Sequence, residues 1–327
     1  MYDVITVGSA TIDVFAKTEA ELINIKHGKE EETLIAYPSG TKILINNLDF
    51  HTGGGGTNTS VAFSRLGLKT AFLGRLGNDN NADLILQELN KEKIDFIGII
   101  GKIQTGYSVV LDSIEEDRTI LTYKGANSNL KFSEIKKSKL KTKWLYFSSM
   151  MGESYKTLEK LAELAKKKKI MVAFNPSSYL AKEGTVFLRK LLKNVDLLIL
   201  NKEESEYLVG HNPTIELLKN LSILGPKYTI ITDGKNGANA YDGEFHYYIK
   251  SNKVRIKETT GAGDSFASGL VAGLVYKNDL KFGLNLGMAN ATSVIKHMGA
   301  KNKLLKYNEA LKEMKKNQKI IVKKVRM

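Results

Sequence analysis

The sequence predicts an α/β protein whose mainly parallel central sheet is covered by helices on both faces, with a small β-sheet lid above one edge. Three observations support this fold class. From residue 144 onward, short apolar runs alternate regularly with helical patterns, which is typical of a parallel sheet. Residues 14–50 and 102–125 break the alternation and are interpreted as two lid excursions. No low-complexity linker interrupts residues 1–327, so we expect a single domain.

The chain before residue 144 combines core and lid elements. In order, the pattern predicts a strand at 4–7, a helix at 58–66, a strand at 70–73 and a helix at 80–91. Residues 107–111 and 119–123 are rich in β-forming side chains and flank an acidic loop, which indicates a hairpin. Two short alternating segments, 34–37 and 42–45, add lid strands, whereas the polar stretch 17–32 shows no regular core pattern.

The remainder follows the strand and helix alternation closely. The predicted strands are 144–147, 170–174, 197–200 and 228–231, and the predicted helices are 154–165, 186–192, 202–208, 214–221 and 266–274. Open α/β sheets bind ligands outside the carboxyl ends of their strands. We therefore expect the lid to stand over that edge.

Composition excludes several classes of function. The chain has no cysteine and five scattered histidines, so thiolate metal sites, disulfides and multi-histidine metal sites are not expected. There is also no Walker A pattern and no strand-linked G-x-G-x-x-G, which removes the usual P-loop and Rossmann interpretations.

The formal charge of +14 raises the question of nucleic acid as a partner. The lysines cluster in runs such as 166–169, without interleaved aromatic residues, and are interpreted as a solvated surface rather than a nucleic-acid site. The N-terminus shows no basic leader, and no apolar run approaches the length of a membrane span, so a cytoplasmic location is expected.

The most informative segment is 259–264, with the sequence TTGAGD. Small residues before a helix allow backbone N–H groups to face an anion, and Asp264 places a carboxylate beside them. Gly261, Ala262 and Gly263 are thus candidates for an anion hole, and Asp264 for a general base. An ordinary capped helix N-terminus would show the same composition.

Two further segments suit a ligand rich in hydroxyl groups. Gly54 and Gly55 belong to a four-glycine run that leads to Asn58, whose side chain can both donate and accept hydrogen bonds. Asp13, expected just after the first strand, could accept hydrogen bonds from two adjacent hydroxyls or could cap a turn.

Two other strand ends carry candidate residues for metal and nucleotide. Asn201 and Glu204 follow a buried strand, where a carboxylate could hold Mg²⁺ or could simply favour a helix start. Thr232, Gly234 and Gly237 connect a strand to the β-like segment 238–241, as in a hairpin turn whose glycines also permit close approach of a nucleotide.

The ordered set of motifs resembles the PfkB or ribokinase-like family of carbohydrate and nucleoside kinases over nearly the whole chain. The matching pieces are Gly8 with Asp13, residues 53–58, 66–67, 74–79, 201–204, 232–234 with Gly237, and 259–264. Each motif is weak alone, but their order is specific. The resemblance implies a ribokinase-like three-layer α/β/α sandwich that transfers the γ-phosphoryl group of ATP, with Mg²⁺, to a substrate hydroxyl.

The resemblance also implies roles for individual residues. Asp264 would act as base and the N–H groups of residues 261–263 as the anion hole. The sugar would be held by Asp13, Gly54, Gly55 and Asn58. Mg²⁺ and phosphates would be organised by Asn201 and Glu204, the latter through water. The nucleotide would lie along Thr232, Gly234, Gly237 and Asn290.

Departures from the family pattern bear on the substrate. Glu258 replaces an aspartate that helps to bind an activating monovalent cation such as K⁺. Gly55 replaces a lysine of ribokinases, and Gly152, next to Glu153, falls where those enzymes place a glutamate on ribose. These differences argue against ribose and leave another sugar or a sugar acid as the acceptor.

Two alternatives to a sugar kinase remain open at this point. In a nucleoside kinase, Phe15, Tyr37 or Tyr107 would form the wall against the base. A sensor that binds a sugar or nucleotide without catalysis is the other alternative. The family resemblance further suggests a homodimer formed through the lid.

Overall fold

The central sheet has ten strands in the computed structural model, which describes residues 1–18, 21–27, 30–112, 118–316 and 323–326. In spatial order these strands are β18 (Lys323–Arg326), β17 (Phe245–Ile249), β16 (Ala238–Tyr241), β15 (Tyr228–Thr232), β14 (Leu197–Asn201), β13 (Met171–Asn175), β12 (Thr142–Ser148), β1 (Tyr2–Val7), β6 (Thr70–Leu73) and β8 (Asp95–Phe96). The strands from β15 to β8 pair in parallel, and β16, β17 and β18 add an antiparallel edge.

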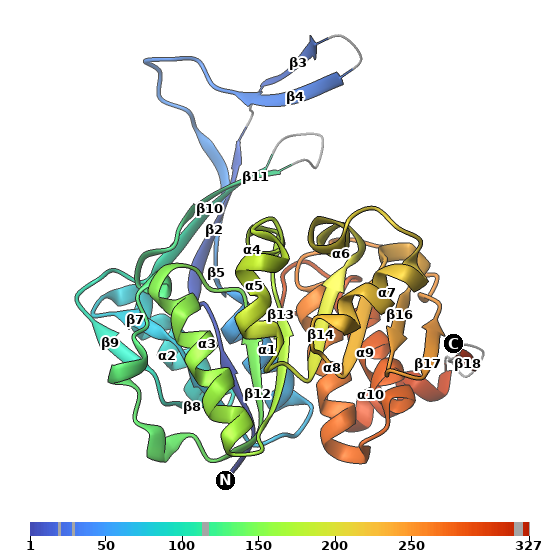
Figure 1. Ribbon diagram of the computed structural model, residues 1–327. Helices are drawn as coiled ribbons and strands as arrows, with labels where there is room; N and C mark the ends of the chain where they lie inside the picture. The colour runs from blue at the N-terminus through green and yellow to red at the C-terminus, as the bar shows by residue number, and fades with distance from the viewer. Residues whose placement is uncertain (19–20, 28–29, 113–117, 317–322, 327) are drawn as a thin grey trace.

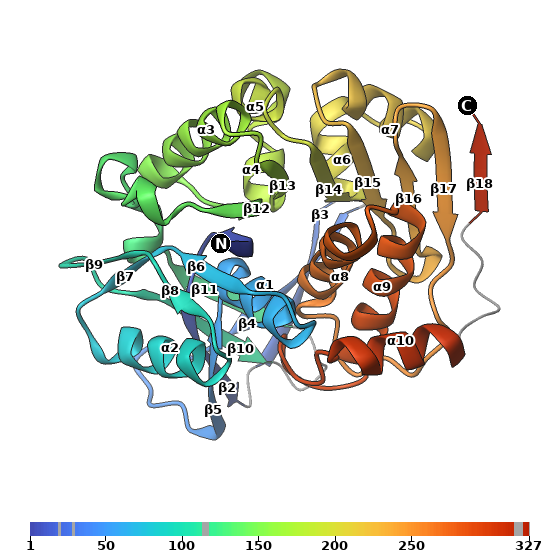
Figure 2. The same ribbon diagram turned by 90° about the horizontal axis from the view of Figure 1, so that it is seen from below.

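Helices cover both faces of this sheet, as Figures 1 and 2 show. One face carries α3 (Gly152–Lys167), α4 (Ser178–Ala181), α5 (Gly184–Leu192), α6 (Lys202–Val209) and α7 (Thr214–Ile223). The other carries α1 (Gly55–Arg65), α8 (Ala262–Lys277), α9 (Leu280–Val294) and α10 (Tyr307–Lys316). α2 (Asn80–Lys91) packs beside α1.

The strand sequences explain why both faces are covered. In β14, Leu198 belongs to the core on one face, and its neighbours Leu197 and Ile199 belong to the core on the other. Since side chains alternate between faces, a continuous apolar run must be buried on both sides. The expected three-layer α/β/α architecture is confirmed. In the described part of the chain, no helix has the length and apolar character needed to cross a membrane.

A second sheet stands over the carboxyl edge of the parallel strands and forms the lid (Figure 1). Its strands, in spatial order, are β11 (Arg118–Tyr123), β10 (Gly106–Asp112), β2 (Thr11–Thr18) and β5 (Ile45–Gly53). β3 (Glu21–His27) and β4 (Glu30–Ala36) form a further hairpin, and β7 (Arg75–Gly77) pairs with β9 (Ile99–Gly101). The predicted hairpin of β10 and β11 is confirmed.

The base of the lid is fixed to the core by one amide side chain. Asn127, in the 3₁₀ turn η1 (Gly125–Ser128), accepts a hydrogen bond from the N–H of Ala10 and donates one to its carbonyl oxygen, each at 2.9 Å. Ala10 lies between β1 and β2. The point at which the chain leaves the core and enters the lid is therefore held by η1.

Three expectations for the lid segments are wrong. Asp13 does not follow the first strand in a turn but lies within β2, because only three residues separate the end of β1 from the start of this new strand. The strand expected at 42–45 begins only at Ile45 and continues to Gly53. The polar stretch expected to be irregular contains β3. Edge and hairpin strands make backbone hydrogen bonds without a buried face, so they lack the alternating pattern.

The predicted boundaries of the core elements agree with the structure more closely than those of the lid strands. The predicted bounds of β6 and α2 are confirmed, while α1 begins at Gly55 rather than at 58. This earlier start is explained by the N–H groups of Gly56 and Thr57, which donate to the carbonyl oxygen of Ser9 at 3.0 and 3.3 Å. A tertiary acceptor thus extends the helix into glycines that propensity disfavours.

Helices α8 and α9 pack closely through glycines. A Cβ atom placed on Gly273 would lie 2.4 Å from the Cα atom of Gly283, and one on Gly269 would lie 2.7 Å from Cα of Gly287. No side chain fits at these distances, so the separation of the helices depends on glycine.

We expect Gly273→Ala to force the two helices apart. Overpacking should lower the free energy of unfolding by about 1–3 kcal/mol, measured by urea denaturation. Gly263→Ala is the matched control on the same helix, because a Cβ atom there meets nothing within 4 Å. Equal stability of both variants would contradict the packing argument.

Candidate active site

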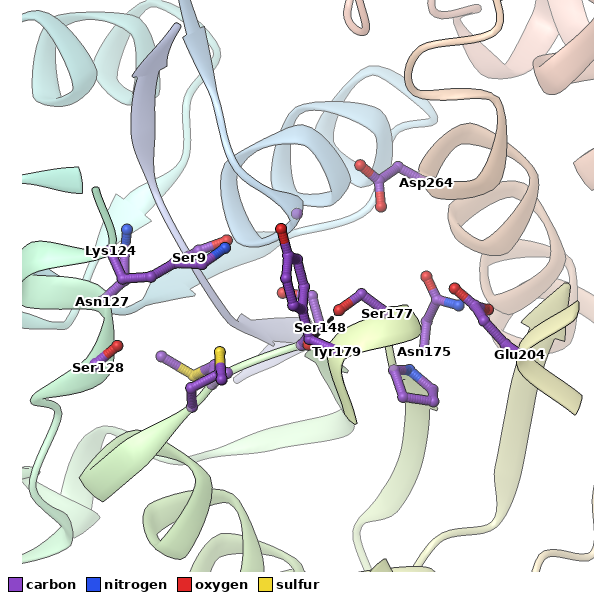
Figure 3. Close-up of a pocket in the computed structure, with 15 residues that line it drawn as sticks. Ser9, Lys124, Asn127, Ser128, Ser148, Asn175, Ser177, Tyr179, Glu204 and Asp264 are labelled. Carbon is purple, nitrogen blue, oxygen red and sulfur yellow. Dashed lines mark hydrogen bonds between the residues drawn. The ribbon is translucent and has the colours of Figure 1, made fainter. Parts of the chain in front are cut away.

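A cavity of about 260 Å³ opens between the carboxyl ends of the parallel strands and the base of the lid (Figure 3). Ser148 and Asn175 reach it from the ends of β12 and β13, Glu204 from α6 and Asp264 from the first turn of α8. Gly55, Lys124 and Tyr179 also line it. The cavity therefore lies where open α/β sheets place their ligands.

Asp264 is held toward this cavity from α8. Its Oδ2 atom accepts a hydrogen bond from Nδ2 of Asn58 on α1 at 3.0 Å. Burial raises the pKa of Asp264 to about 6, although the hydrogen bond from Asn58 and the charge of Lys301 both oppose this rise. The carboxyl group is thus a base of useful strength at neutral pH.

The conformation of the turn before Asp264 depends on glycine. Gly261 has φ +76°, and a Cβ atom there would lie 2.6 Å from Cα of Ala300, so the turn requires glycine. Gly263 faces open space. The N–H of Ala262 donates to the carbonyl oxygen of Thr259 at 3.1 Å. The other first-turn N–H groups of a helix have no intrahelical acceptor.

The glycines of the four-glycine run face in different directions. Gly55 lines the cavity, and a Cβ atom there would lie 2.9 Å from Cβ of Ser148 and 3.8 Å from Oδ1 of Asp264. Gly54, with φ +93°, packs against the backbone of Ser9, and Gly56 packs against Gly8. Two of these glycines therefore allow the chain to pack, while Gly55 leaves room beside Asp264.

Asp13 lies beside this run. A Cβ atom on Gly53 would be only 1.8 Å from Oδ2 of Asp13, so glycine at 53 makes space for the carboxylate. Asp13 lines a second, smaller cavity of about 130 Å³ together with Lys301. The side chain of Lys301 is largely buried there and donates hydrogen bonds to Thr52 and Glu88.

Asn201 and Glu204 form a reciprocal cap at the start of α6. The N–H of Glu204 donates to Oδ1 of Asn201 at 2.7 Å, and the N–H of Asn201 donates to Oε2 of Glu204 at 2.9 Å. Burial raises the pKa of Glu204 to about 7. The helix-start interpretation is correct for both residues, and Glu204 nevertheless lines the cavity.

The described residues offer no site for a metal held by protein ligands alone. Within the described residues, no three carboxylate or histidine side chains cluster in a way that could hold one. Mg²⁺ in kinases is usually held by one or two carboxylates together with substrate phosphates. A single buried carboxylate at Glu204 is compatible with that mode, since a cation would stabilise its ionised form.

The residues expected along the nucleotide differ in accessibility. Thr232 ends β15, and Gly234 opens a 3₁₀ turn with φ +46° and no atom near its Cβ position. Gly237, with φ +96°, packs against the carbonyl oxygen of Ile249. Asn290 is fully buried, donating to the carbonyl of Ser265 and accepting from the N–H of Leu305. Its amide is therefore engaged within the protein.

Glu258 lies just before the turn of residues 259–264. Its Oε2 atom accepts a hydrogen bond from the N–H of Gly299 at 2.7 Å. This contact ties the approach to the anion turn to the segment that follows α9.

Several buried polar atoms around the site have no hydrogen-bond partner. They are Oδ1 of Asn58, Oγ of Ser148 and Oγ1 of Thr260. Buried polar atoms are normally satisfied, so an unsatisfied group around a cavity indicates a place for ligand atoms. Asn58 and Ser148 both lie beside Asp264.

The sequence did not reveal several cavity residues. Lys124, Asn127, Asn175 and Tyr179 belong to no recognised motif, and only their positions at strand ends and turns could have suggested them. Conversely, none of the three aromatic residues expected against a base lines the cavity of about 260 Å³, although Phe15 lines the smaller one. Glu153 is exposed and pairs with Lys156 at 2.5 Å.

Comparison with known proteins is consistent with this geometry. Residues 1–306 match the model of the pfkB family carbohydrate kinases. An ATP-dependent 6-phosphofructokinase of Thermoanaerobacterium thermosaccharolyticum is 26% identical over 309 residues, covering 91% of this chain and 89% of that protein. A ribokinase of Haemophilus influenzae is 26% identical over 280 residues, covering 83% of this chain and 90% of that protein.

The fold is likewise similar to that of a solved kinase. The structure of Arabidopsis thaliana ribokinase complexed with ribose and ATP aligns with TM-score 0.82 at 21% identity, covering 96% of this chain and 99% of that one. The family match and the kinase relatives show a phosphotransferase with an alcohol group as acceptor. The chain belongs to the pfkB family of carbohydrate kinases, and is a sugar or nucleoside kinase of that family.

We expect Asp264→Asn to stabilise the protein in a pH-dependent way. The folded-state pKa of about 6 lies above the ordinary value of 3.8, so the folded protein binds more protons than the unfolded chain between them. Its stability therefore falls as pH rises through that window. The variant escapes this loss and should be more stable by about 1–3 kcal/mol at about pH 8, and by less than about 1 kcal/mol at about pH 4.

Thermal or urea unfolding at the two pH values measures this difference. A gain of the same size at both would show that burial of the Asp264 charge is not its cause.

Proposed function

We propose that this protein phosphorylates a hydroxyl group of a sugar or sugar-like substrate with ATP, using Asp264 as general base. The observation that carries the proposal is the position of Asp264 on the cavity, in the first turn of α8 and bonded to Asn58. A carboxylate beside helix-terminal N–H groups combines a proton acceptor with an anion site.

In the proposed reaction, Asp264 takes the proton of the acceptor hydroxyl while the oxygen of that hydroxyl bonds to the γ-phosphorus of ATP. The bond from that phosphorus to the β,γ-bridging oxygen breaks, and ADP leaves. Charge on the transferred group is stabilised by the backbone N–H groups of Gly261, Ala262 and Gly263. The pKa of about 6 leaves Asp264 largely ionised at neutral pH and still able to hold the proton.

The nucleotide is proposed to lie on the α8 side of the carboxyl edge, near Thr232, Gly234 and Gly237. Glu204, oriented by its cap with Asn201, would hold Mg²⁺ through water. The metal would neutralise phosphate charge when bound. Asn290 supports the site indirectly, through its hydrogen bond to the carbonyl of Ser265 at the start of α8.

The acceptor is proposed to lie between Asp264 and the lid, held by Asp13, Gly54, Gly55 and Asn58. Closure of the lid, the two excursions 14–50 and 102–125, over the acceptor would exclude water and limit hydrolysis of ATP. Ribose is disfavoured, because Gly55 supplies no side chain and Glu153 is paired with Lys156 outside the cavity.

A nucleoside is the second candidate acceptor. Tyr179, with Met150 and Met151, gives the cavity an aromatic and apolar wall that a base could contact.

A panel of acceptors with ATP and Mg²⁺ tests the function. We expect release of ADP to depend on one substrate among pentoses, hexoses, keto-deoxy acids and nucleosides. Asp264→Asn should lower kcat/KM by about 10²–10⁴-fold, because general-base catalysis contributes that much. Retained nucleotide binding controls for folding of the variant.

Full turnover by Asp264→Asn would remove Asp264 as the base. Tight binding of an acceptor without any phosphorylated product would instead favour the sensor. The same panel, measured with and without K⁺, tests whether Glu258 helps to bind an activating monovalent cation. If it does, activation by K⁺ should be lost in Glu258→Ala.

We further propose that the lid mediates a homodimer. Apolar side chains on its strands are exposed, among them Phe50 (59%), Leu121 (56%) and Ile120 (52%). Such side chains on sheet strands favour association. Sedimentation velocity should show a dimer that Phe50→Lys with Leu121→Lys converts to monomer, whereas a monomeric wild type at micromolar concentration would exclude it.

A further inference from the structure

Lys124 places a cation in the candidate active site that the proposed reaction does not use. It follows β11 of the lid and directly precedes η1, the turn whose Asn127 fixes the lid base to Ala10. Its side chain lines the candidate active-site cavity of about 260 Å³ and is partly buried. The position of this ammonium group is thus set by both the lid and the core.

The charge of Lys124 is not neutralised by an ion pair. Across the described ranges, no carboxylate lies within ion-pair distance of its Nζ atom. Nζ instead lies 4.6 Å from the centroid of the Tyr179 ring. Burial lowers the pKa of Lys124, and the more distant charge of Asp13 only partly offsets this. A partly desolvated cation without a partner is costly, and an anionic ligand would remove that cost.

The surroundings of Lys124 suit an oxyanion. Ser128, Ser149 and Ser177 line the same cavity, and the hydroxyl of Ser177 donates to that of Ser149 at 2.8 Å. Hydroxyl groups and an ammonium group are both donors to carboxylate or phosphate oxygens. The hydroxyl groups of these serines can therefore complete, with Lys124, a binding site for an anionic group.

The charges of the cavity are separated. Figure 3 shows Lys124 and Ser128 on one side, and Asp264 and Glu204 on the other. A ligand that presents a hydroxyl group to Asp264 would direct its opposite end toward Lys124. The cavity of about 260 Å³ lies below the range of about 300–1,000 Å³ typical for drug-sized ligands, so a small acceptor fits.

We propose that the acceptor is an anionic sugar derivative, a sugar acid or a sugar phosphate, whose carboxylate or phosphate group binds Lys124. This inference rests on the proposed kinase function and narrows its substrate class. It also separates the two charged ligands: Lys124 recognises the acceptor, whereas the turn of residues 261–263 receives the transferred phosphoryl group.

Matched acceptor pairs test the proposal with the full-length protein, ATP and Mg²⁺. The pairs are glucose with gluconate, fructose with fructose 6-phosphate, and the methyl ester of 2-keto-3-deoxygluconate with the free acid. Initial rates of ADP release give kcat and KM for each acceptor and for ATP. Calorimetric titration of each acceptor gives its affinity independently of turnover. The carboxylate and phosphate pairs distinguish the two kinds of anion.

Three variants separate the charge of Lys124 from other effects. Lys124→Met removes the charge and keeps length, and Lys124→Arg restores the charge. Lys137→Met is the matched control, because Lys137 also lies over an aromatic ring, with Nζ 4.9 Å from the Phe132 centroid, but does not line the cavity.

We expect at least one anionic acceptor to exceed its neutral partner in kcat/KM. Lys124→Met should lower kcat/KM for that acceptor by about 10- to 100-fold, mainly through KM, as expected for a lost hydrogen bond to a charged group. The KM of ATP and the rates with neutral acceptors should change less than about twofold. Lys124→Arg should recover most of the loss, and Lys137→Met should behave as wild type.

The proposal is overturned if only neutral acceptors turn over. It is also overturned if Lys124→Met lowers kcat/KM equally for neutral and anionic acceptors, or if this variant mainly changes the KM of ATP. The last result would assign Lys124 to the nucleotide phosphates. If no acceptor of the panel turns over, the proposed function fails on that panel. Calorimetry then decides this inference separately, since anion binding that depends on Lys124 supports it and binding unaffected by Lys124→Met excludes it.

Discussion

The active-site edge depends on the close approach of two backbone segments at the base of the lid. A Cβ atom on Gly56 would lie 2.7 Å from the carbonyl carbon of Gly8, and one on Gly54 would lie 2.6 Å from the carbonyl oxygen of Ser9. Only glycine allows this contact. It sets the N-terminus of α1 against the end of β1, and so brings Asn58 within hydrogen-bond distance of Asp264, which lies 206 residues further along the chain.

Ionisable groups whose charged forms are destabilised by burial are gathered around the cavity beside this contact. Burial raises the pKa of both Asp264 and Glu204, and it lowers the pKa of Lys124. Oγ of Ser148, beside them, has no hydrogen-bond partner. None of these groups is stabilised fully by the protein itself, whereas a phosphorylated, hydroxyl-bearing ligand with Mg²⁺ would satisfy them. Shifted pKa values gathered in one cavity are typical of functional sites.

Sequence could predict the layers of the fold and the residues that lie in contiguous motifs, because burial on both faces and glycine turns leave local patterns. The turn at Gly261 and the cap formed by Asn201 are of this kind. β5 was missed because its exposed edge position imposes no alternation. Lys124 and Tyr179 were missed because their proximity depends on tertiary packing between distant segments. Asn290, which the resemblance places along the nucleotide, has both ends of its side-chain amide hydrogen-bonded within the protein, a tertiary contact that a helical sequence pattern does not reveal.

The two sides of the cavity differ in how freely their residues can be substituted. On the α8 side, the turn at Gly261 is confined by Ala300 and Asp264 is bonded to Asn58, so substitutions there disturb the backbone together with the proposed base. On the lid side, Lys124 and Ser128 lie in the turn after β11, and turns tolerate side-chain changes. If Asp264 and Lys124 act as proposed, the phosphoryl-transfer chemistry can remain constant on α8 while recognition of the acceptor changes at the lid junction. Sequence motifs describe the first side well, and for this reason they identify the reaction more readily than the acceptor.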